Sequence, residues 1–287
     1  MGTAQFGMDY GVTNQRGRIP KTEIREILRY CYKNYIHTID TAANYGNSEE
    51  ILGELISNRQ FNIYSKIPHL NVSIFDNKEL NAVEKTFFRS LNKLKVNQME
   101  GIFVHNADNL LAQNSDKLFH LIMKWKHTGL IKKVGVSIYD EIQLNSILDH
   151  YDIDIFQIPI NIYDQRLIHS DILDEIKKRN IEIHARSIFL QGLLLTDPKK
   201  LPKKFKSLIP IHYKLESLFL RHELTKLEGA LQFILQIKQI DCMLVGINNL
   251  HHIMEIVQSL KKLKKETYID FKDFQINNVT LIDPRRW

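Results

Sequence analysis

The stretch GIFVHNADNLLAQNSDKLFHLIMKWKHTGLIKKVGVS, residues 101–137, contains the pattern that decides the fold. It begins with a short apolar run, Gly101–His105, and ends with a second one, Lys133–Ser137. Near-continuous apolar runs are typical of strands buried on both faces of a sheet. Between the runs lies an apolar stripe at helical spacing, made of Leu118, Leu121, Ile122 and Trp125. The stretch therefore predicts a strand–helix–strand unit of a parallel sheet.

The same alternation continues in both directions along the chain. Six further runs are predicted as strands: 2–6, 37–40, 61–66, 155–158, 181–185 and 242–245. Helical stripes fall between several of them, at residues 24–31, 80–94 and 253–260. Eight strands alternating with helices predict an α/β fold, a (β/α)8 TIM barrel forming one domain over residues 1–287. We expect the segment Ser187–Asp241 to contain an extended loop and an extra helix, and residues 266–287 to form a C-terminal tail.

The competing architecture is an open, doubly wound sheet. A dinucleotide-binding sheet of that kind normally carries G-x-G-x-x-G after its first strand. None of the twelve glycines forms this pattern, and a Walker A loop is missing as well. These absences favour the barrel.

Composition narrows the class of protein further. The chain is 44% hydrophobic and 25% charged, which excludes a disordered polymer. The longest stretch without a charged residue, Cys242–Met254, is too short to span a bilayer, and the N-terminus shows no secretion signal. Two cysteines form no disulfide framework or zinc-ligand spacing, so we expect a cytoplasmic protein without a metal site. The net charge of +6 favours anionic ligands, but dispersed basic residues favour neither nucleic acid nor membrane.

Polar side chains stand where the predicted strands end. Asp40, Lys66 and His105 end three consecutive strands, and Tyr45 follows Asp40 by five positions. Function in a (β/α)8 barrel collects at the C-terminal ends of the strands. We therefore expect these four side chains to surround one pocket.

Together the four side chains suit proton donation to a carbonyl. Tyrosine alone titrates near pH 10, and a neighbouring ammonium such as that of Lys66 is expected to lower that pKa. Asp40 would keep the lysine charged, and His105 would bond the substrate oxygen or relay a proton. The set suits hydride addition to a carbonyl, but neither metal hydrolysis nor Ser or Cys nucleophilic catalysis. A barrel lyase or isomerase with Lys66 as Schiff-base amine is an alternative.

Residues 40–53, DTAANYGNSEEILG, resemble the D-T-A-x-x-Y-G-x-S-E-x-x-L-G signature of the aldo/keto reductases. The pairs Ser65–Lys66 and His105–Asn106 are similar to two later motifs of that family, and Gly135–Ser137 to a third. The resemblance runs from Gly2 to about Val257, which is most of the chain.

The resemblance implies roles for individual residues. Tyr45 would be the general acid, tuned by Lys66 and Asp40, and His105 would orient the carbonyl. NADP, with NAD as the alternative, would lie extended across the barrel mouth. The implied cofactor-binding residues are Thr3, Ala4, Gln5, Ser137, Gln157, Arg186, Ser187, Phe189, Gln191, Gly192, Gly246, Asn248, Asn249 and Glu255. Among them, Ser137 and Gln157 would hold the nicotinamide carboxamide.

Several positions depart from the family pattern. Ile138 stands where many members carry Asn, and Arg186 where an aromatic side chain usually stacks on the nicotinamide. The basic residues that commonly hold the 2′-phosphate are replaced by Gly246, Asn248 and His252. A lysine-rich loop, residues 199–206, is either solvated or a compensating phosphate site.

The function expected from the sequence is NAD(P)H-dependent reduction of a small aldehyde or ketone. The ending Ile282–Trp287 resembles that of a family branch often found near surface-polysaccharide enzymes, which favours a sugar-derived substrate. The alternative from another class is a nicotinamide-binding sensor or assembly subunit with little turnover. The oligomeric state is left open.

Overall fold

The computed structural model describes residues 1–56, 61–168, 171–264 and 267–287. Its sheet contains seven parallel strands in the order β1-β2-β3-β4-β5-β6-β7, so that each strand pairs with its neighbour along the chain. The strands are β1 (Thr38–Asp40), β2 (Asn62–Ile67), β3 (Met99–Val104), β4 (Ile131–Ser137), β5 (Ile155–Pro159), β6 (Glu182–Arg186) and β7 (Cys242–Met243). This curled parallel sheet with surrounding helices confirms the predicted barrel class.

The predicted first strand at Gly2–Phe6 is wrong beyond its first residue. Gly2 forms a single parallel bridge with Asp40, and its amide donates to the Val245 carbonyl at 2.8 Å, so it joins β1 to the β7 side. The chain then turns into the short helix α1 (Ala4–Gly7). The Phe6 and Met8 amides bond back to the Thr3 and Ala4 carbonyls, which removes them from any sheet ladder.

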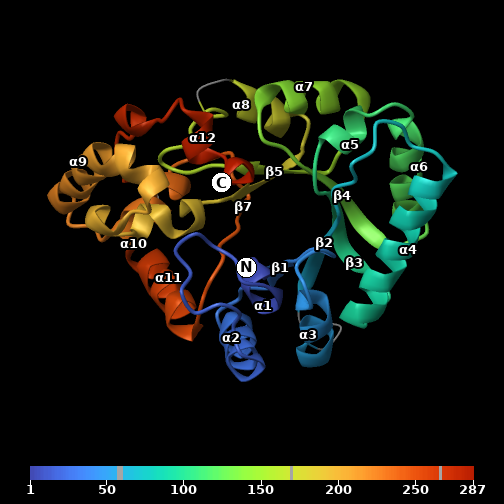
Figure 1. Cartoon of the computed structure of the whole chain (residues 1–287), viewed down its shortest axis with the longest axis horizontal. Helices are drawn as coiled ribbons and strands as arrows, with labels where there is room; N and C mark the ends of the chain where they lie inside the picture. The colour runs from blue at the N-terminus through green and yellow to red at the C-terminus, as the bar shows by residue number, and fades with distance from the viewer. Residues whose placement is uncertain (57–60, 169–170, 265–266) are drawn as a thin grey trace.

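Helices surround the sheet as a ring (Figure 1). Within this ring of helices, α4 packs against α6 through the stacked side chains of Phe87 and Trp125, whose aromatic centroids are 3.8 Å apart. The ring closes where α11, late in the chain, packs beside α2, early in the chain. The helices are α2 (Lys21–Lys33), α3 (Ser48–Leu55), α4 (Asn77–Leu94), α5 (Asp108–Leu111), α6 (Ser115–His127), α7 (Glu141–His150), α8 (Ile172–Lys178), α9 (Ile209–Arg221), α10 (Lys226–Leu235), α11 (Leu250–Lys262) and α12 (Val279–Ile282). In the described ranges, no helix is both long and apolar enough to cross a membrane.

The segment Ser187–Asp241 holds two helices, α9 and α10, after three 3₁₀ segments, Leu190–Leu195, Pro198–Lys200 and Lys203–Leu208. The tail, described from residue 267, contains α12 and two more 3₁₀ turns, Lys272–Phe274 and Pro284–Arg286. It ends near the middle of the ring (Figure 1). Lys204 donates to the Arg286 carbonyl at 2.7 Å, and the Trp287 ring packs edge-on against Phe205. Part of the lysine-rich loop thus fastens the tail.

The loop after β1, which carries Tyr45, is fixed by buried contacts. Gly7 packs directly beneath it: a β-carbon on Gly7 would lie 1.8 Å from the Tyr45 carbonyl oxygen. Gly46, at φ +56°, faces Gly7 from the other side, and its added β-carbon would lie 2.1 Å from the Gly7 oxygen. Ser48 is fully buried and donates to the Thr3 carbonyl at 3.0 Å. The loop and α1 therefore form one rigid unit.

We expect Gly7→Ala to disturb that unit. A methyl group forced against backbone should destabilise the protein by about 2–3 kcal/mol, because neither partner is a flexible side chain. Gly2→Ala is the matched control, since its added β-carbon meets no atom closer than 3.6 Å. Urea unfolding measures both variants. Equal midpoints for Gly7→Ala and wild type would show that the contact does not constrain the loop.

Candidate active site

A buried ion pair lies at the carboxyl ends of β1 and β2. The Lys66 ammonium contacts the Asp40 carboxylate and also donates to the Thr41 carbonyl at 3.0 Å. The two charged side chains are only 1% and 8% exposed. Lys66 lies beneath the neighbouring cleft and is not among its lining residues. Burial lowers the pKa of Lys66, and the Asp40 carboxylate opposes this effect. Because the Lys66 amine does not line the cleft, its position disfavours the Schiff-base alternative.

Tyr45 and His105 lie above this pair and face a cleft of about 590 Å³. The Lys66 nitrogen is 5.2 Å from the centre of the Tyr45 ring. The Tyr45 and His105 rings meet edge to face, with centroids 6.0 Å apart. The structure therefore brings together all four residues that the sequence placed around one pocket.

The expected lowering of the Tyr45 pKa is wrong for this arrangement. Burial, followed by the Asp40 charge, raises the pKa of the Tyr45 phenol well above its usual value, and Arg186 opposes this only in part. The Lys66 charge is compensated by Asp40, which limits its effect on the phenol. Tyr45 holds its proton at neutral pH, as an unperturbed tyrosine also does, and the raised pKa makes it a weaker acid than free tyrosine.

His105 is neutral at physiological pH. Burial, and next the positive charges of Lys66 and Arg186, lower the pKa of its imidazole to about 3. A neutral imidazole can bond a substrate oxygen but has no extra proton to give. Of the two expected roles, this state favours orientation of the carbonyl over proton relay.

Gln157 extends the buried network to β5. Its amide nitrogen donates to the second Asp40 oxygen at 2.8 Å, and its amide oxygen lies 3.5 Å from the Ser137 hydroxyl. Both side chains are buried. Ser137 does not line the cleft, whereas Gln157 does. Their predicted role toward a carboxamide stays a prediction, and their observed partners are each other and Asp40.

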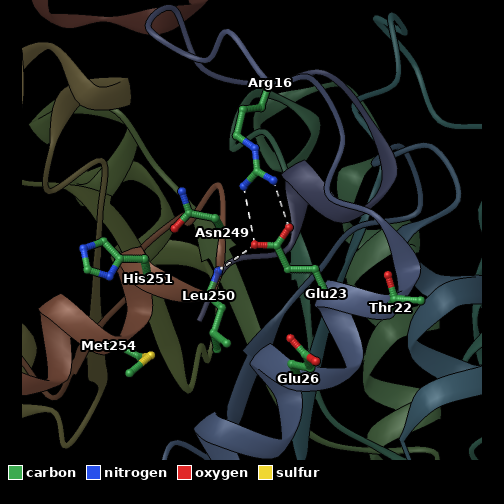
Figure 2. Close-up of a pocket in the computed structure, with 8 residues that line it drawn as sticks. All are labelled: Arg16, Thr22, Glu23, Glu26, Asn249, Leu250, His251 and Met254. Atoms are coloured by element: carbon green, nitrogen blue, oxygen red, sulfur yellow. Dashed lines mark hydrogen bonds and ion pairs between the residues drawn. The ribbon is translucent and has the colours of Figure 1, made fainter.

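The cleft extends from this cluster to the start of α11. Its lining includes most residues that the family resemblance assigns to a cofactor: Thr3, Ala4, Gln5, Gln157, Arg186, Ser187, Phe189, Gln191, Gly192, Gly246, Asn248 and Glu255. Asn249 instead lines a second pocket, of about 520 Å³ (Figure 2). There its side chain accepts from the His252 amide and caps α11.

One wall of the cleft carries backbone strain. Ser187, Leu190 and Gln191 all have positive φ, between 47° and 59°, and Gly192 follows at 91°. Such conformations cost non-glycine residues about 1 kcal/mol or more each and concentrate at functional sites. The segment is held by Thr13, whose hydroxyl donates to the Gln191 carbonyl at 3.1 Å. Strain held in place by neighbouring contacts is consistent with a ligand-binding wall.

Several lining residues were missed by the sequence reasoning. The main ones are Tyr139, Thr13, Thr225 and Lys226, which lie on loops or at a helix start. The sequence could have predicted Tyr139 as a lining residue, because it follows Ser137, the last residue of a predicted strand, by two positions. Its ring lies 4.1 Å from the Arg186 guanidinium and 3.4 Å from that of Arg285 in the tail. Arg186 also donates to the Ile138 carbonyl at 3.1 Å.

The fold and the site together define a parallel α/β barrel with an Asp–Tyr–Lys–His cluster facing a long cleft. A sequence model of the Aldo/keto reductase family matches residues 1–275, and the chain belongs to that family.

Several known proteins resemble the chain in sequence or in structure. D-arabinose 1-dehydrogenase of Saccharomyces cerevisiae is 24% identical over 146 residues, which span 48% of this chain and 42% of that enzyme. An aldo-keto reductase of Bacillus halodurans superposes with a TM-score of 0.73 at 16% identity, covering 96% of this chain and 88% of the other. A glycerol dehydrogenase of Gluconobacter oxydans gives 0.69 at 20% identity, covering 99% and 91%. The two structures show the shared fold.

The buried ion pair predicts a large effect for Asp40→Asn. Removing one charge leaves Lys66 buried without a counter-charge, which should cost about 3–5 kcal/mol of unfolding free energy. The exposed pair Arg179–Glu175 provides the control, because Glu175→Gln should cost less than about 1 kcal/mol. Chemical unfolding at pH 7 measures both. Similar losses in the two variants would contradict the importance of the buried pair.

The neutral His105 predicts acid sensitivity. Its folded pKa of about 3 lies below the unfolded value of about 6.5. The unfolded state therefore binds protons first, and folded stability falls as pH drops below 6.5. Between pH 7 and pH 5, His105→Gln should lose about 2 kcal/mol less unfolding free energy than wild type. Parallel losses in both proteins would exclude this contribution.

Proposed function

We propose that the protein is a nicotinamide-dependent oxidoreductase that reduces an aldehyde or ketone, with Tyr45 as general acid. The observation that carries the proposal is the protonated Tyr45 phenol facing the cleft above the buried Lys66–Asp40 pair. A proton donor of this kind is required at the carbonyl oxygen. The neutral His105 next to it supplies a second hydrogen-bonding group.

In this mechanism the substrate carbonyl oxygen lies between Tyr45 and His105. The bound nicotinamide supplies a hydride to the carbonyl carbon. Tyr45 gives its proton to the oxygen, so that an alcohol forms and a phenolate remains. The positive charge of Arg186 stabilises that phenolate, and Lys66, which is paired with Asp40 and lies 5.2 Å from the ring centre, contributes less. The phenol then recovers a proton from solvent.

The residues of the cleft fit an extended dinucleotide. The reacting end would lie at the cluster of Tyr45 and His105, the diphosphate along the strained segment 187–192, and the adenosine toward α11. Gly246 and Gln5 pack closely along this part of the cleft, since a β-carbon on Gly246 would lie 2.9 Å from the Gln5 amide nitrogen. NADP or NAD suits this shape.

A sugar-derived carbonyl is the substrate class that we favour. Two relatives, the yeast D-arabinose dehydrogenase and the Gluconobacter glycerol dehydrogenase, are named for polyhydroxy compounds. Polar groups of Arg186 and Tyr139 beside Tyr45 offer hydrogen bonds to substrate hydroxyls.

A nicotinamide-binding subunit with little turnover is the second candidate. One observation favours it: Arg186 is held against Tyr139 and Ile138, where family members usually place an open aromatic platform for the nicotinamide. Such a protein would bind the dinucleotide but leave carbonyl compounds unreduced.

Substitution of Tyr45 tests the proposed acid. Tyr45→Phe should lower kcat for an aldose by about a hundredfold or more while leaving the cofactor Kd nearly unchanged, because only the proton donor is lost. Cofactor oxidation at 340 nm against a panel of aldehydes and aldoses measures kcat, and fluorescence titration measures Kd. Tyr151→Phe, which removes a hydroxyl bonded to Ser115 on α6, is the control and should keep wild-type turnover.

The possible results separate the candidates. Wild-type turnover in Tyr45→Phe would show that another group is the acid. Binding of cofactor without turnover on any carbonyl would favour the low-turnover subunit. Failure to bind either NADH or NADPH would exclude both.

A further inference from the structure

The C-terminal tail reaches the wall of the cleft through Arg285. Its guanidinium carbon lies 3.4 Å from the centre of the Tyr139 ring, and Tyr139 lines the cleft together with Tyr45. Arg285 does not line the cleft itself, so its contact with this wall is through Tyr139. The two residues after Arg285 are fastened to the loop 199–206, which keeps the end of the tail in place.

The Arg285 side chain is held in one orientation by Asp283. Its Nε donates to one Asp283 oxygen at 3.0 Å, and an Nη donates to the other at 2.6 Å. Asp283 is only 2% exposed and also accepts the Arg285 amide at 3.0 Å. Burial opposes ionisation of this carboxyl, but the hydrogen bonds from Arg285 outweigh burial and lower its pKa. The charge of Arg285 is thus compensated within the tail, and its guanidinium offers Tyr139 a fixed, planar packing surface.

Tyr139 in turn contacts Arg186, a cation of the cleft wall. The Arg186 guanidinium carbon lies 4.1 Å from the centre of the Tyr139 ring. The same group donates to the Ile138 carbonyl at 3.1 Å and to the Ser187 hydroxyl at 3.4 Å. In the described part of the chain its partners are these neutral groups, with no acidic side chain among them. Because no counter-charge holds it, the direction of this guanidinium depends on the Tyr139 ring and on the two oxygens.

Arg186 is placed to act on the proposed acid. It lines the cleft with Tyr45 and His105, and its positive charge opposes the rise in the pKa of the Tyr45 phenol that burial causes. A phenolate on Tyr45 is stabilised most by a cation whose direction is fixed before the reaction. A guanidinium turned toward solvent would lose most of this effect, because water screens the charge.

We propose that Arg285 is a positioning residue for the reaction, which by packing on Tyr139 keeps the Arg186 guanidinium directed at Tyr45. The inference rests on the proposed function, since it concerns the phenolate formed in that mechanism. Without Arg285, the Tyr139 ring can move into the space that the side chain leaves, and Arg186 loses its support. The tail then contributes to catalysis although none of its described residues lines the cleft.

Arg285→Gln tests this role with NADH or NADPH and an aldehyde or aldose that the wild type reduces. We expect kcat to fall about tenfold while KM and the cofactor Kd change less than about threefold, because the effect is on the transition state. The variant also leaves Asp283 buried without its partner. The double variant of Arg285→Gln with Asp283→Asn removes both charges and should show the same loss. Arg286→Gln is the matched control and should keep wild-type turnover, since that tail arginine is 55% exposed and 3.9 Å from Asp283.

A double-mutant cycle with Arg186→Gln separates positioning from a general loss of structure. Arg186→Gln alone should lower kcat at least about tenfold. Adding Arg285→Gln should lower it less than about twofold further, because the group through which Arg285 acts is already gone. A crystal structure of Arg285→Gln should show the Arg186 guanidinium turned away from Tyr45. Losses that multiply in the cycle, or an unmoved guanidinium, would overturn the inference.

These results are distinguishable from failure of the proposed function. Wild-type kcat in Arg285→Gln, together with the expected loss in Tyr45→Phe, would overturn the positioning role and leave the general acid standing. A wild-type protein that reduces no carbonyl compound would contradict the proposed function, and the positioning role with it. Thermal unfolding of each variant confirms that the measurements refer to folded protein.

Discussion

The site depends on one interaction, the buried ion pair between Lys66 and Asp40. Two charges removed from water are costly, and the pair is tolerated because its remaining polar groups also find partners. Lys66 donates to Thr41, and Gln157 donates to the second Asp40 oxygen. Three strands, β1, β2 and β5, are thereby tied together by side chains across the barrel mouth. The cluster sits in the barrel because only the strand ends converge closely enough to supply all of these groups.

Residues 40–53 contribute to the packing of the fold as well as to the candidate active site. Asp40 and Tyr45 line the cleft, whereas Ser48 and Glu49 face inward and are buried. Ser48 bonds the Thr3 carbonyl, and Glu49 accepts from Ser65 at 2.6 Å, next to Lys66 in β2. The same fourteen residues thus place Tyr45 and hold the strand that carries Lys66. Because this short segment both supplies site residues and packs against β2, its sequence pattern predicts the fold as well as the site.

The sequence predicted the strands after Gly2–Phe6 and the residues of the central cluster, because both follow from local patterns. Apolar runs identify buried strands, and polar residues at their ends fall at one edge of a parallel sheet. The same reasoning failed at Gly2–Phe6, where packing against the Tyr45 loop turns the chain into a helix after one bridge. It also failed for the Tyr45 pKa, because burial of a phenol depends on the three-dimensional surroundings. Tyr139 and Lys226 were missed because loops position them.

The distribution of charge along the cleft also differs from what the net charge suggests. A chain of charge +6 is expected to attract anions, yet its basic loop at residues 199–206 supplies no lining residue, and Lys204 of that loop bonds the tail. Among the described residues that line the cleft, the arginine and lysine side chains are Arg186, which lies against Tyr139, and Lys226, which is paired with Glu216. Under the proposed function a phenolate would form on Tyr45 beside Arg186, which is where a cation would lower the barrier. The charge of the cleft is therefore better explained by the reaction proposed for its Tyr45 end than by the net charge of the whole chain.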